Sequence, residues 1–363
     1  MAEVSQAQVE SALKSYVDPY LEKDLVSAKC VKDIRVNGGR AEVDVVLGFP
    51  ASGYADELAA QLKSLVEGVE GVDSAEVKVE SNIVSHAVQK GVEPIKGIKN
   101  IIAVASGKGG VGKSTTAVNL ALALAAEGAR VGILDADIYG PSQPRMLGVH
   151  GKPESKDGKT LEPMKNHDVQ AMSIGFLVDE ETPMIWRGPM VTQALQQLLN
   201  DTNWDDLDYL VVDLPPGTGD TQLTLAQQVP VSGAVIVTTP QDIALLDARK
   251  GLKMFEKVEV PVLGIVENMS IHICSNCGHE EHIFGEGGGK RMAEQYEVDF
   301  LGALPLDIRI REETDAGKPT VVAEPESRIA QIYREIARRT AARLSQQGKN
   351  YAAKFPKIVI QNN

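Results

Sequence analysis

The chain of 363 residues is poor in cysteine, in aromatic side chains and in long apolar runs. Its three cysteines are too few for the disulfide framework of a small secreted domain and are typical of a reducing compartment. Aromatic residues make up only 4%, which disfavours a base-stacking surface for nucleic acid. No apolar run reaches the roughly 18 residues that a membrane-spanning helix needs. These absences exclude three broad classes of protein.

Charge and the first residues add further exclusions. The net charge of −13 argues against a dedicated nucleic-acid binder, so we expect no nucleic-acid partner. The N-terminal residues lack a basic region followed by an apolar core, and we therefore expect a cytoplasmic protein without a secretory signal. Hydrophobic residues make up 43%, enough for a real core, and the length suits two domains.

The first domain is predicted to span residues 1–90 and to be a small α+β unit. Ser5 and Gln8 have the spacing of a capping box at the start of a helix. Residues 34–45 alternate in polarity around an Asn-Gly-Gly turn, which predicts a β-hairpin. Residues 55–66 carry an apolar stripe at helical spacing, which predicts a second helix.

The second domain, residues 91–363, alternates short strands with helices. The strands are rich in Val and Ile and mostly do not alternate in polarity, as expected of strands buried on both faces. They are predicted at 101–105, 130–134, 209–212, 234–238, 262–266 and 299–303. The predicted fold class is therefore α/β, an open, mainly parallel sheet with helices on both faces, preceded by the small α+β domain. Ligands of such sheets bind at the carboxyl ends of the strands.

A glycine-rich segment between the first of these strands and the next helix fits the phosphate-loop pattern G-x-x-x-x-G-K-[ST]. Its residues are Gly107, Lys108, Gly109, Gly110, Val111, Gly112, Lys113, Ser114 and Thr115. Backbone N–H groups and a helix N-terminus cradle phosphates in this arrangement, which predicts a P-loop NTPase that binds ATP. Lys113 would reach the β- and γ-phosphates, and the Ser114 hydroxyl would bind Mg²⁺. The alternative is a chance glycine-rich loop, against which the strand–loop–helix context argues.

Two acidic motifs follow the phosphate loop, each at the end of a predicted strand. They contain Asp137 and Asp213. An aspartate after a buried strand beside a phosphate loop holds Mg²⁺, usually through water. Gly217, four residues after Asp213, can offer its N–H to a γ-phosphate. A lone strand-end aspartate is as often a helix cap, but two of them in this order favour the nucleotide site.

The sequence also contains a C-x-x-C pair, Cys274 and Cys277. Such a turn points both sulfurs at one metal, but two thiolates cannot complete a site of four ligands. A symmetric dimer supplies two more, and four cysteines suit a [4Fe–4S] cluster that bridges subunits. Two alternatives stay open from spacing alone. They are zinc, completed within one chain by His279 and His282, and a redox-active dithiol.

The phosphate loop, with its second lysine directly after the first glycine, resembles the deviant Walker A motif of the MinD/ParA/nitrogenase-iron-protein class. In that class the first lysine reaches the nucleotide of a partner subunit. The resemblance implies that Lys108 acts across a homodimer interface. It also implies that Asp137 orients or polarises the attacking water and that Asp213 is the Walker B acid.

A narrower resemblance, covering essentially the whole chain, is to the Mrp/ApbC family of iron–sulfur carrier ATPases. It rests on the C-x-x-C pair and on the segments Asp135–Ser142, Trp186–Met190, Asp213–Asp220 and Glu267–Ser270. The resemblance implies ATP hydrolysis, transient binding of a [4Fe–4S] cluster and its transfer to apoproteins, with cluster scaffold proteins as further partners. It favours iron–sulfur over zinc and makes Asn268 a candidate adenine contact.

Residues 1–90 resemble the MIP18-type domain that often precedes such an ATPase, although Ala51 stands where many of those domains carry a cysteine. The competing function is a positioning ATPase of the MinD or ParA kind. It predicts no metal and a basic or membrane-seeking face, which the acidic charge and the C-x-x-C pair contradict. The helix predicted at 326–345 has an apolar stripe without Trp or Phe, so we expect it to pack on its own domain and expect no stable membrane association.

Overall fold

The computed structural model describes residues 4–89, 91–178, 188–274 and 276–349. Trp186 and Arg187 of the motif at 186–190 lie outside these residues, as does Ser275 between the paired cysteines.

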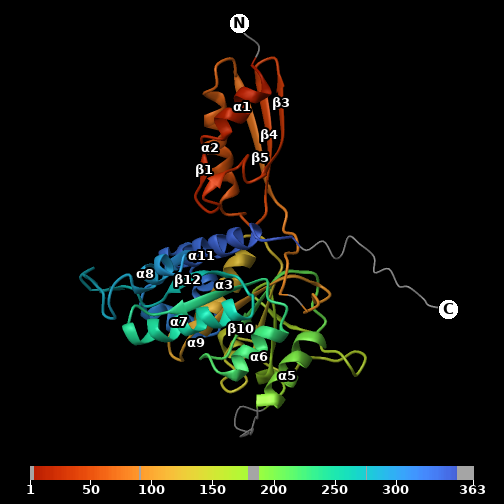
Figure 1. The fold of residues 1–363 in the computed structure, drawn as a ribbon, viewed down its shortest axis with the longest axis vertical. Coiled ribbons are helices and arrows are strands. Elements are labelled where there is room, and N and C mark those ends of the chain that lie inside the picture. Colours follow the sequence, from red (N-terminus) through yellow and green to blue (C-terminus); the bar gives the residue numbers. More distant parts are fainter. Residues whose placement is uncertain (1–3, 90, 179–187, 275, 350–363) are drawn as a thin grey trace, which may run out of the picture.

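The N-terminal part of the chain forms a three-stranded sheet against which two helices pack (Figure 1). The elements are α1 (Gln6–Leu13), β3 (Val31–Asn37), β4 (Arg40–Leu47), α2 (Ala55–Glu67) and β5 (Ser74–Ser81), with a short pair β1 (Val17–Asp18) and β2 (Lys23–Asp24). β3 and β4 form the predicted antiparallel hairpin, and β5 joins β4 in parallel. The predicted capping box at Ser5 and Gln8 is present, so this local signal is confirmed.

The larger part of the described chain is built on an eight-stranded sheet with the order β15-β12-β11-β6-β10-β7-β9-β8. All its neighbouring strands pair in parallel except β8, which lies antiparallel at one edge. The strands are β6 (Ile98–Ala105), β7 (Val131–Asp135), β8 (Met164–Asn166), β9 (Val169–Ser173), β10 (Leu207–Asp213), β11 (Gly233–Thr238), β12 (Val262–Glu267) and β15 (Phe300–Ala303). The predicted fold class is confirmed, although β8 and β9 were not expected.

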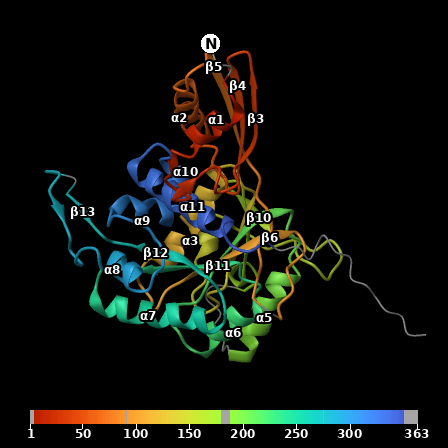
Figure 2. The ribbon, with the colours of Figure 1, turned by 45° about the horizontal axis from the view of Figure 1, so that its top comes forward.

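Helices cover both faces of this sheet, as Figures 1 and 2 show. α3 and α11 lie on the side facing the N-terminal unit, and α6 and α7 lie on the opposite side. The helices are α3 (Lys113–Ala126), α4 (Gln143–Met146), α5 (Gly188–Asn200), α6 (Asp220–Gln228), α7 (Asp242–Lys257), α8 (Gly288–Gln295), α9 (Ile308–Asp315), α10 (Thr320–Ala323) and α11 (Arg328–Ser345).

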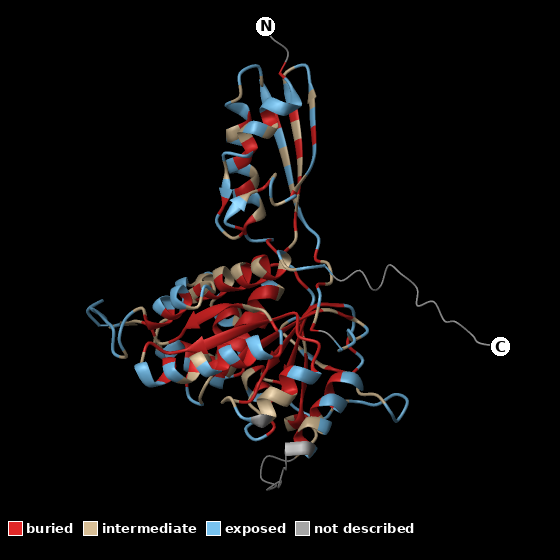
Figure 3. Cartoon of the chain, viewed as in Figure 1, coloured by how far each residue is buried: buried red, intermediate tan, exposed pale blue. Residues whose placement is uncertain are grey.

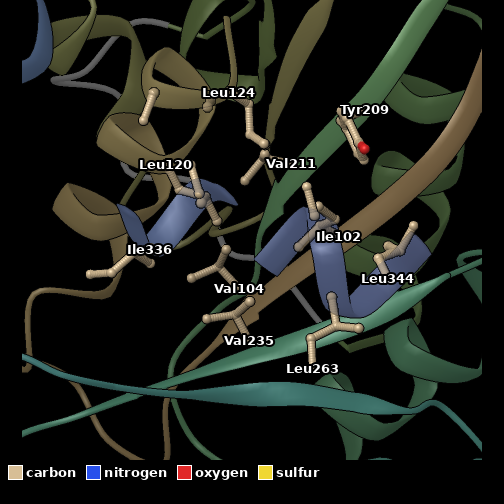
Figure 4. Close-up of a cluster of buried hydrophobic side chains, with 14 of the residues drawn as sticks. Ile102, Val104, Leu120, Leu124, Tyr209, Val211, Val235, Leu263, Ile336 and Leu344 are labelled. Atoms are coloured by element: carbon tan, nitrogen blue, oxygen red, sulfur yellow. The ribbon is translucent and has the colours of Figure 1, made fainter. Parts of the chain in front are cut away.

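The core lies between the sheet and these helices. Buried residues follow the strands, while exposed ones lie on the outer faces of the helices (Figure 3). In Figure 4, Val211 from the sheet lies near Leu120 and Leu124 of α3. α11 buries its apolar stripe on its own domain, as predicted. No helix of the described residues is long and apolar enough to cross a membrane.

The N-terminal unit contacts the large domain at the C-terminal end of α3. Glu127, the C-cap of α3, is 1% exposed, and its carboxylate accepts the N–H of Gly53 at 2.9 Å. The same carboxylate binds Arg334 and Arg338 of α11, each at 2.7 Å. One buried acid therefore joins the N-terminal unit, α3 and α11.

Candidate functional site

The phosphate loop runs from β6 into α3 at the carboxyl edge of the sheet. Gly110 and Gly112 have φ angles of +80° and +82°, which favour glycine. A Cβ on Gly107 would lie 2.1 Å from the backbone carbon of Asp247, so no larger residue fits there. Gly107, Gly110 and Gly112 are therefore required by the path of the loop itself.

Lys113, Ser114 and Asp213, predicted to share a nucleotide site, lie together in the structure. The amine of Lys113 forms a buried ion pair with Asp213 at the end of β10 and lies 3.1 Å from the Ser114 hydroxyl. Gln143 Nε2 donates to the second oxygen of Asp213 at 2.9 Å and to the Ser114 carbonyl at 3.1 Å. Gln143 was not expected to contribute, and its place at the start of α4 brings it here.

Asp135, at the end of β7, holds the loop that carries Asp137. Its carboxylate accepts N–H groups from Ser142 at 2.9 Å, Gln143 at 3.0 Å and Asp137 at 3.2 Å. Burial and, second, the charge of Asp213 raise the pKa of Asp135 to about 7. No separate role was expected of Asp135, although its position at the end of a fully buried strand could have indicated one.

Asp137 is partly buried beside the same ion pair. Burial raises the pKa of its carboxyl group, and the nearby charge of Lys113 opposes this shift. Asp137 therefore lies within electrostatic reach of Lys113.

The residues at this site fit Mg²⁺. Oxygen donors, which Mg²⁺ prefers, are available from Ser114, Asp213 and Asp137. In the part of the chain that the structure describes, Gln143 Oε1 and Ser142 Oγ are buried without a hydrogen-bond partner. Water molecules bound to the metal can supply those partners, because they donate hydrogen bonds to neighbouring acceptors.

Lys108 and Gly217 were also predicted to contact the nucleotide, but their side-chain and backbone contacts in the structure do not point to a phosphate position. Lys108 is partly buried, and its amine makes no ion pair with the residues that the structure describes. Ser106 Oγ donates to the Lys108 carbonyl at 2.9 Å and fixes the backbone there. The N–H of Gly217 donates to the Ser106 carbonyl at 2.9 Å, so a bond to a γ-phosphate would replace that contact.

Asn268 lies directly against the phosphate loop. Its side-chain amide donates to the Val111 carbonyl at 2.9 Å, and its side-chain oxygen accepts the N–H of Met269 at 2.9 Å. A Cβ on Gly112 would lie 2.1 Å from Asn268 Nδ2, so the glycine also makes room for this contact. The segment after β12 is thereby joined to the middle of the loop.

The C-x-x-C pair lies at the end of a β-hairpin that begins a few residues after Asn268. β13 (His272–Ile273) and β14 (Glu280–Glu281) pair antiparallel, and the hairpin projects from the body of the molecule (Figure 2). Cys277 is exposed and Cys274 partly buried. Hydrogen bonds from the backbone of Cys277 and Asn276 lower the pKa of the Cys274 thiol, which favours the thiolate that binds metal.

Within the described chain, no three His, Cys, Asp or Glu side chains are grouped to hold a metal ion. His282 Nδ1 lies 2.8 Å from the Ser270 carbonyl instead of joining the cysteines. One chain therefore offers two thiols at this position, and a full set of four ligands needs groups from elsewhere.

Comparison with known proteins assigns the chain to a family. Residues 97–341 match the family described as NUBPL iron-transfer P-loop NTPase. The chain belongs to this family. Residues 6–79 match a second family, described as iron–sulfur cluster assembly protein, so the NUBPL-type NTPase domain is preceded by an assembly-type domain.

Two relatives of this NUBPL-family chain are named for iron–sulfur clusters. The iron–sulfur cluster carrier protein of Escherichia coli strain K12 is 53% identical over 348 residues, covering 96% of this chain and 94% of that protein. The iron–sulfur cluster transfer protein NUBPL of Mus musculus is 54% identical over 254 residues, covering 69% of this chain and 80% of that protein.

Solved structures support the fold. The nucleotide-binding protein of Archaeoglobus fulgidus in complex with ADP has a TM-score of 0.56 and 40% identity, covering 64% of this chain and 90% of that chain. The cell-division ATPase MinD of Pyrococcus furiosus has a TM-score of 0.50 and 24% identity, covering 66% of this chain and 97% of that chain. The second likeness concerns the fold alone.

Proposed function

We propose that this NUBPL-family protein binds and hydrolyses ATP and, as a homodimer, carries a [4Fe–4S] cluster that it transfers to apoproteins. The observation that carries the proposal is the continuity between the two candidate sites. Asn268 holds the phosphate loop at Val111, and the same segment of chain leads directly into the hairpin with Cys274 and Cys277. The names of the relatives and the ADP complex of the Archaeoglobus structure support both halves of the proposal.

In the nucleotide site, Lys113 exchanges its ion pair with Asp213 for the β- and γ-phosphates of ATP. Ser114 and Asp213 are then free to hold Mg²⁺, which when bound neutralises charge on the phosphate oxygens. Asp137 orients the attacking water. Lys108 contributes its charge to the nucleotide of the partner subunit, where it stabilises the charge that develops during hydrolysis.

In the cluster site, two hairpins related by a dimer two-fold axis supply four thiolates. Because Cys277 is exposed, thiolates of an apoprotein can approach the cluster and replace the carrier's thiolates one by one. Each displaced sulfur leaves as a thiolate and then takes a proton from solvent, so the exchange needs no oxidant or reductant. A closed, buried zinc site would prevent such exchange.

The proposal is tested by anaerobic reconstitution with iron and sulfide. We expect a dimer with about four irons per two chains, by the four-cysteine argument, and restored activity of an apo [4Fe–4S] enzyme added afterwards. Cys274→Ser and Cys277→Ser should abolish both results, and the matched control Cys30→Ser, at a buried thiol, should abolish neither. Stoichiometric zinc on a monomer, or transfer that persists without the paired cysteines, would contradict the proposal.

A further inference from the structure

A cavity of about 450 Å³ lies between the N-terminal unit and the C-terminal end of α11. The residues that line it are drawn from four segments of the chain, 21–32, 46–48, 82–86 and 345–349, of which only some members face the cavity. His86, one of the lining residues, is hydrogen-bonded to Asn100 near the start of β6, whereas the phosphate loop follows the other end of that strand. The cavity therefore belongs to neither of the sites proposed above.

The lining of this cavity is strongly basic. It contains Lys23, Lys29, Lys32 and Lys349 and no aspartate or glutamate, in a chain whose net charge is −13. None of these four amines forms an ion pair with a carboxylate of the described residues. Lys23 donates to Gln346 at 3.0 Å and Lys32 to the Lys29 carbonyl at 2.5 Å, and neither acceptor carries charge. Four ammonium groups without a paired carboxylate in the described chain therefore surround one cavity, and their charges favour an anion there.

The inner wall of the cavity carries two further polar side chains. Cys30 is 6% exposed, and burial raises the pKa of its thiol; the charges of Lys32 and Lys349 oppose this shift, and that of Asp18 adds to it. His86 is 1% exposed, its Nδ1 lies 2.9 Å from Asn100 Oδ1, and its Nε2 has no hydrogen-bond partner of good geometry in the described chain. The same cavity is thus lined by the four lysines and by a buried imidazole whose Nε2 has no hydrogen bond of good geometry among the described residues.

We propose that this cavity binds a small polyanion, a metabolite with phosphate or several carboxylate groups. The volume is within the range of small-molecule sites, and ammonium groups form strong charge-assisted hydrogen bonds to phosphate and carboxylate oxygens. Lys29 and Lys32 come from the N-terminal unit and Lys349 follows α11, so a bound polyanion would connect the two parts.

The test is calorimetric titration of the full-length protein with pyrophosphate and, separately, with citrate, in saturating Mg-ADP. The two probes distinguish phosphate from carboxylate ligands. Lys29→Gln with Lys32→Gln should weaken binding of the preferred probe about tenfold or more, by the strength of charged hydrogen bonds. The matched control, Lys159→Gln with Lys290→Gln, removes the same charge at exposed lysines away from the cavity and should leave the affinity unchanged.

A second readout uses Cys30 as a reporter. In Cys274→Ser/Cys277→Ser protein it is the remaining one of three cysteines, and the preferred probe should slow its alkylation by a neutral maleimide about fivefold or more, by occupancy of the cavity. Three results overturn the proposal. The first is no measurable binding of either probe, and the second is equal loss of affinity in the Lys29→Gln/Lys32→Gln protein and in the control protein. The third is binding that Lys113→Ala abolishes but the Lys29→Gln/Lys32→Gln change leaves intact. The last result would assign the probe to the phosphate loop.

Discussion

The side-chain amide of Asn268 donates a hydrogen bond of 2.9 Å to the backbone carbonyl of Val111, in the middle of the phosphate loop. This bond connects the loop to the segment that leads into the cysteine hairpin. If phosphate binding and the proposed cluster binding both act on this short connection, occupancy of one site should change affinity at the other. Such coupling is reciprocal by thermodynamic necessity.

The first prediction concerns this bond. Asn268→Ala should weaken binding of both ATP and GTP about tenfold, because the loop loses a hydrogen bond worth about 1 kcal/mol and some of its order. If Asn268 also contacts adenine, as the resemblance implies, the loss for ATP is the larger one. Fluorescence titration with both nucleotides measures the ratio. Asn203→Ala, at an exposed asparagine, is the control. Equal losses of affinity for ATP and GTP would contradict a contact between Asn268 and adenine.

The second prediction concerns the buried ion pair between Lys113 and Asp213. Lys113→Ala should lower ATPase turnover by on the order of a hundredfold or more, because it removes a preorganised charge at the phosphates. Without nucleotide it should also lower stability by about 3 kcal/mol, because Asp213 is fully buried and loses its cation.

Two variants separate these effects. Adding Asp213→Asn to Lys113→Ala should restore much of the stability to denaturation by urea, since the unpaired charge is gone, but none of the ATPase activity. Normal turnover by Lys113→Ala would contradict the assignment of the phosphate loop.

The third prediction is a pH dependence due to Asp135. Its pKa rises from 3.8 to about 7 on folding, so between these values the unfolded chain releases a proton that the folded protein keeps. Asp135 therefore lowers stability as the pH rises through this window, by up to about 1.4 kcal/mol per pH unit, and its effect is constant above it. Asp135→Asn should remove this slope. Urea unfolding of both proteins from pH 4 to 8 measures it, and parallel profiles would contradict the shift.

The sequence predicted the parts of the fold that depend on local pattern. Buried strands such as β6 and β10 are continuous apolar runs, and the glycines at 107, 110 and 112 are required by the loop backbone. β9 was not predicted because it is short and contains Gln170 and Met172 instead of a run of Val and Ile. β8 is shorter still and lies at the sheet edge, so neither strand carries a strong signal.

The sequence predicted most of the residues that form the candidate site, but not the contacts between them. Lys113 and Asp213 were expected to belong to the same nucleotide site. Their ion pair and the hydrogen bonds from Gln143, however, depend on how loops from separate parts of the chain pack together. The hairpin that carries Cys274 consists of strands of two residues each, too short for any periodicity. Such features arise from tertiary packing, which a pattern of residue types does not encode.

The fourth prediction concerns Lys108, which we propose acts on the partner's nucleotide. Lys108→Ala should bind ATP but hydrolyse it slowly, because the lysine contributes charge in the transition state more than in binding. Mixing Lys108→Ala with Lys113→Ala subunits creates one site in which Lys113 and the opposing Lys108 are both intact. Recovery of part of the ATPase activity in verified mixed dimers supports action across the interface, and no recovery would place the role of Lys108 within its own chain.

The fifth prediction concerns Glu127, whose carboxylate joins the N-terminal unit to α3 and α11. Glu127→Gln leaves Arg334 and Arg338 without their anion in a buried environment, which should cost about 3 kcal/mol. Because Gly53 donates to the same carboxylate, the N-terminal unit should also separate more readily from the large domain, and limited proteolysis should cut faster between residues 91 and 97. Glu335→Gln is the matched control, since Glu335 lies on α11, the helix that carries Arg334 and Arg338, and its side chain is 41% exposed. Equal cleavage rates of the two variants would show that Glu127 does not hold the N-terminal unit in place.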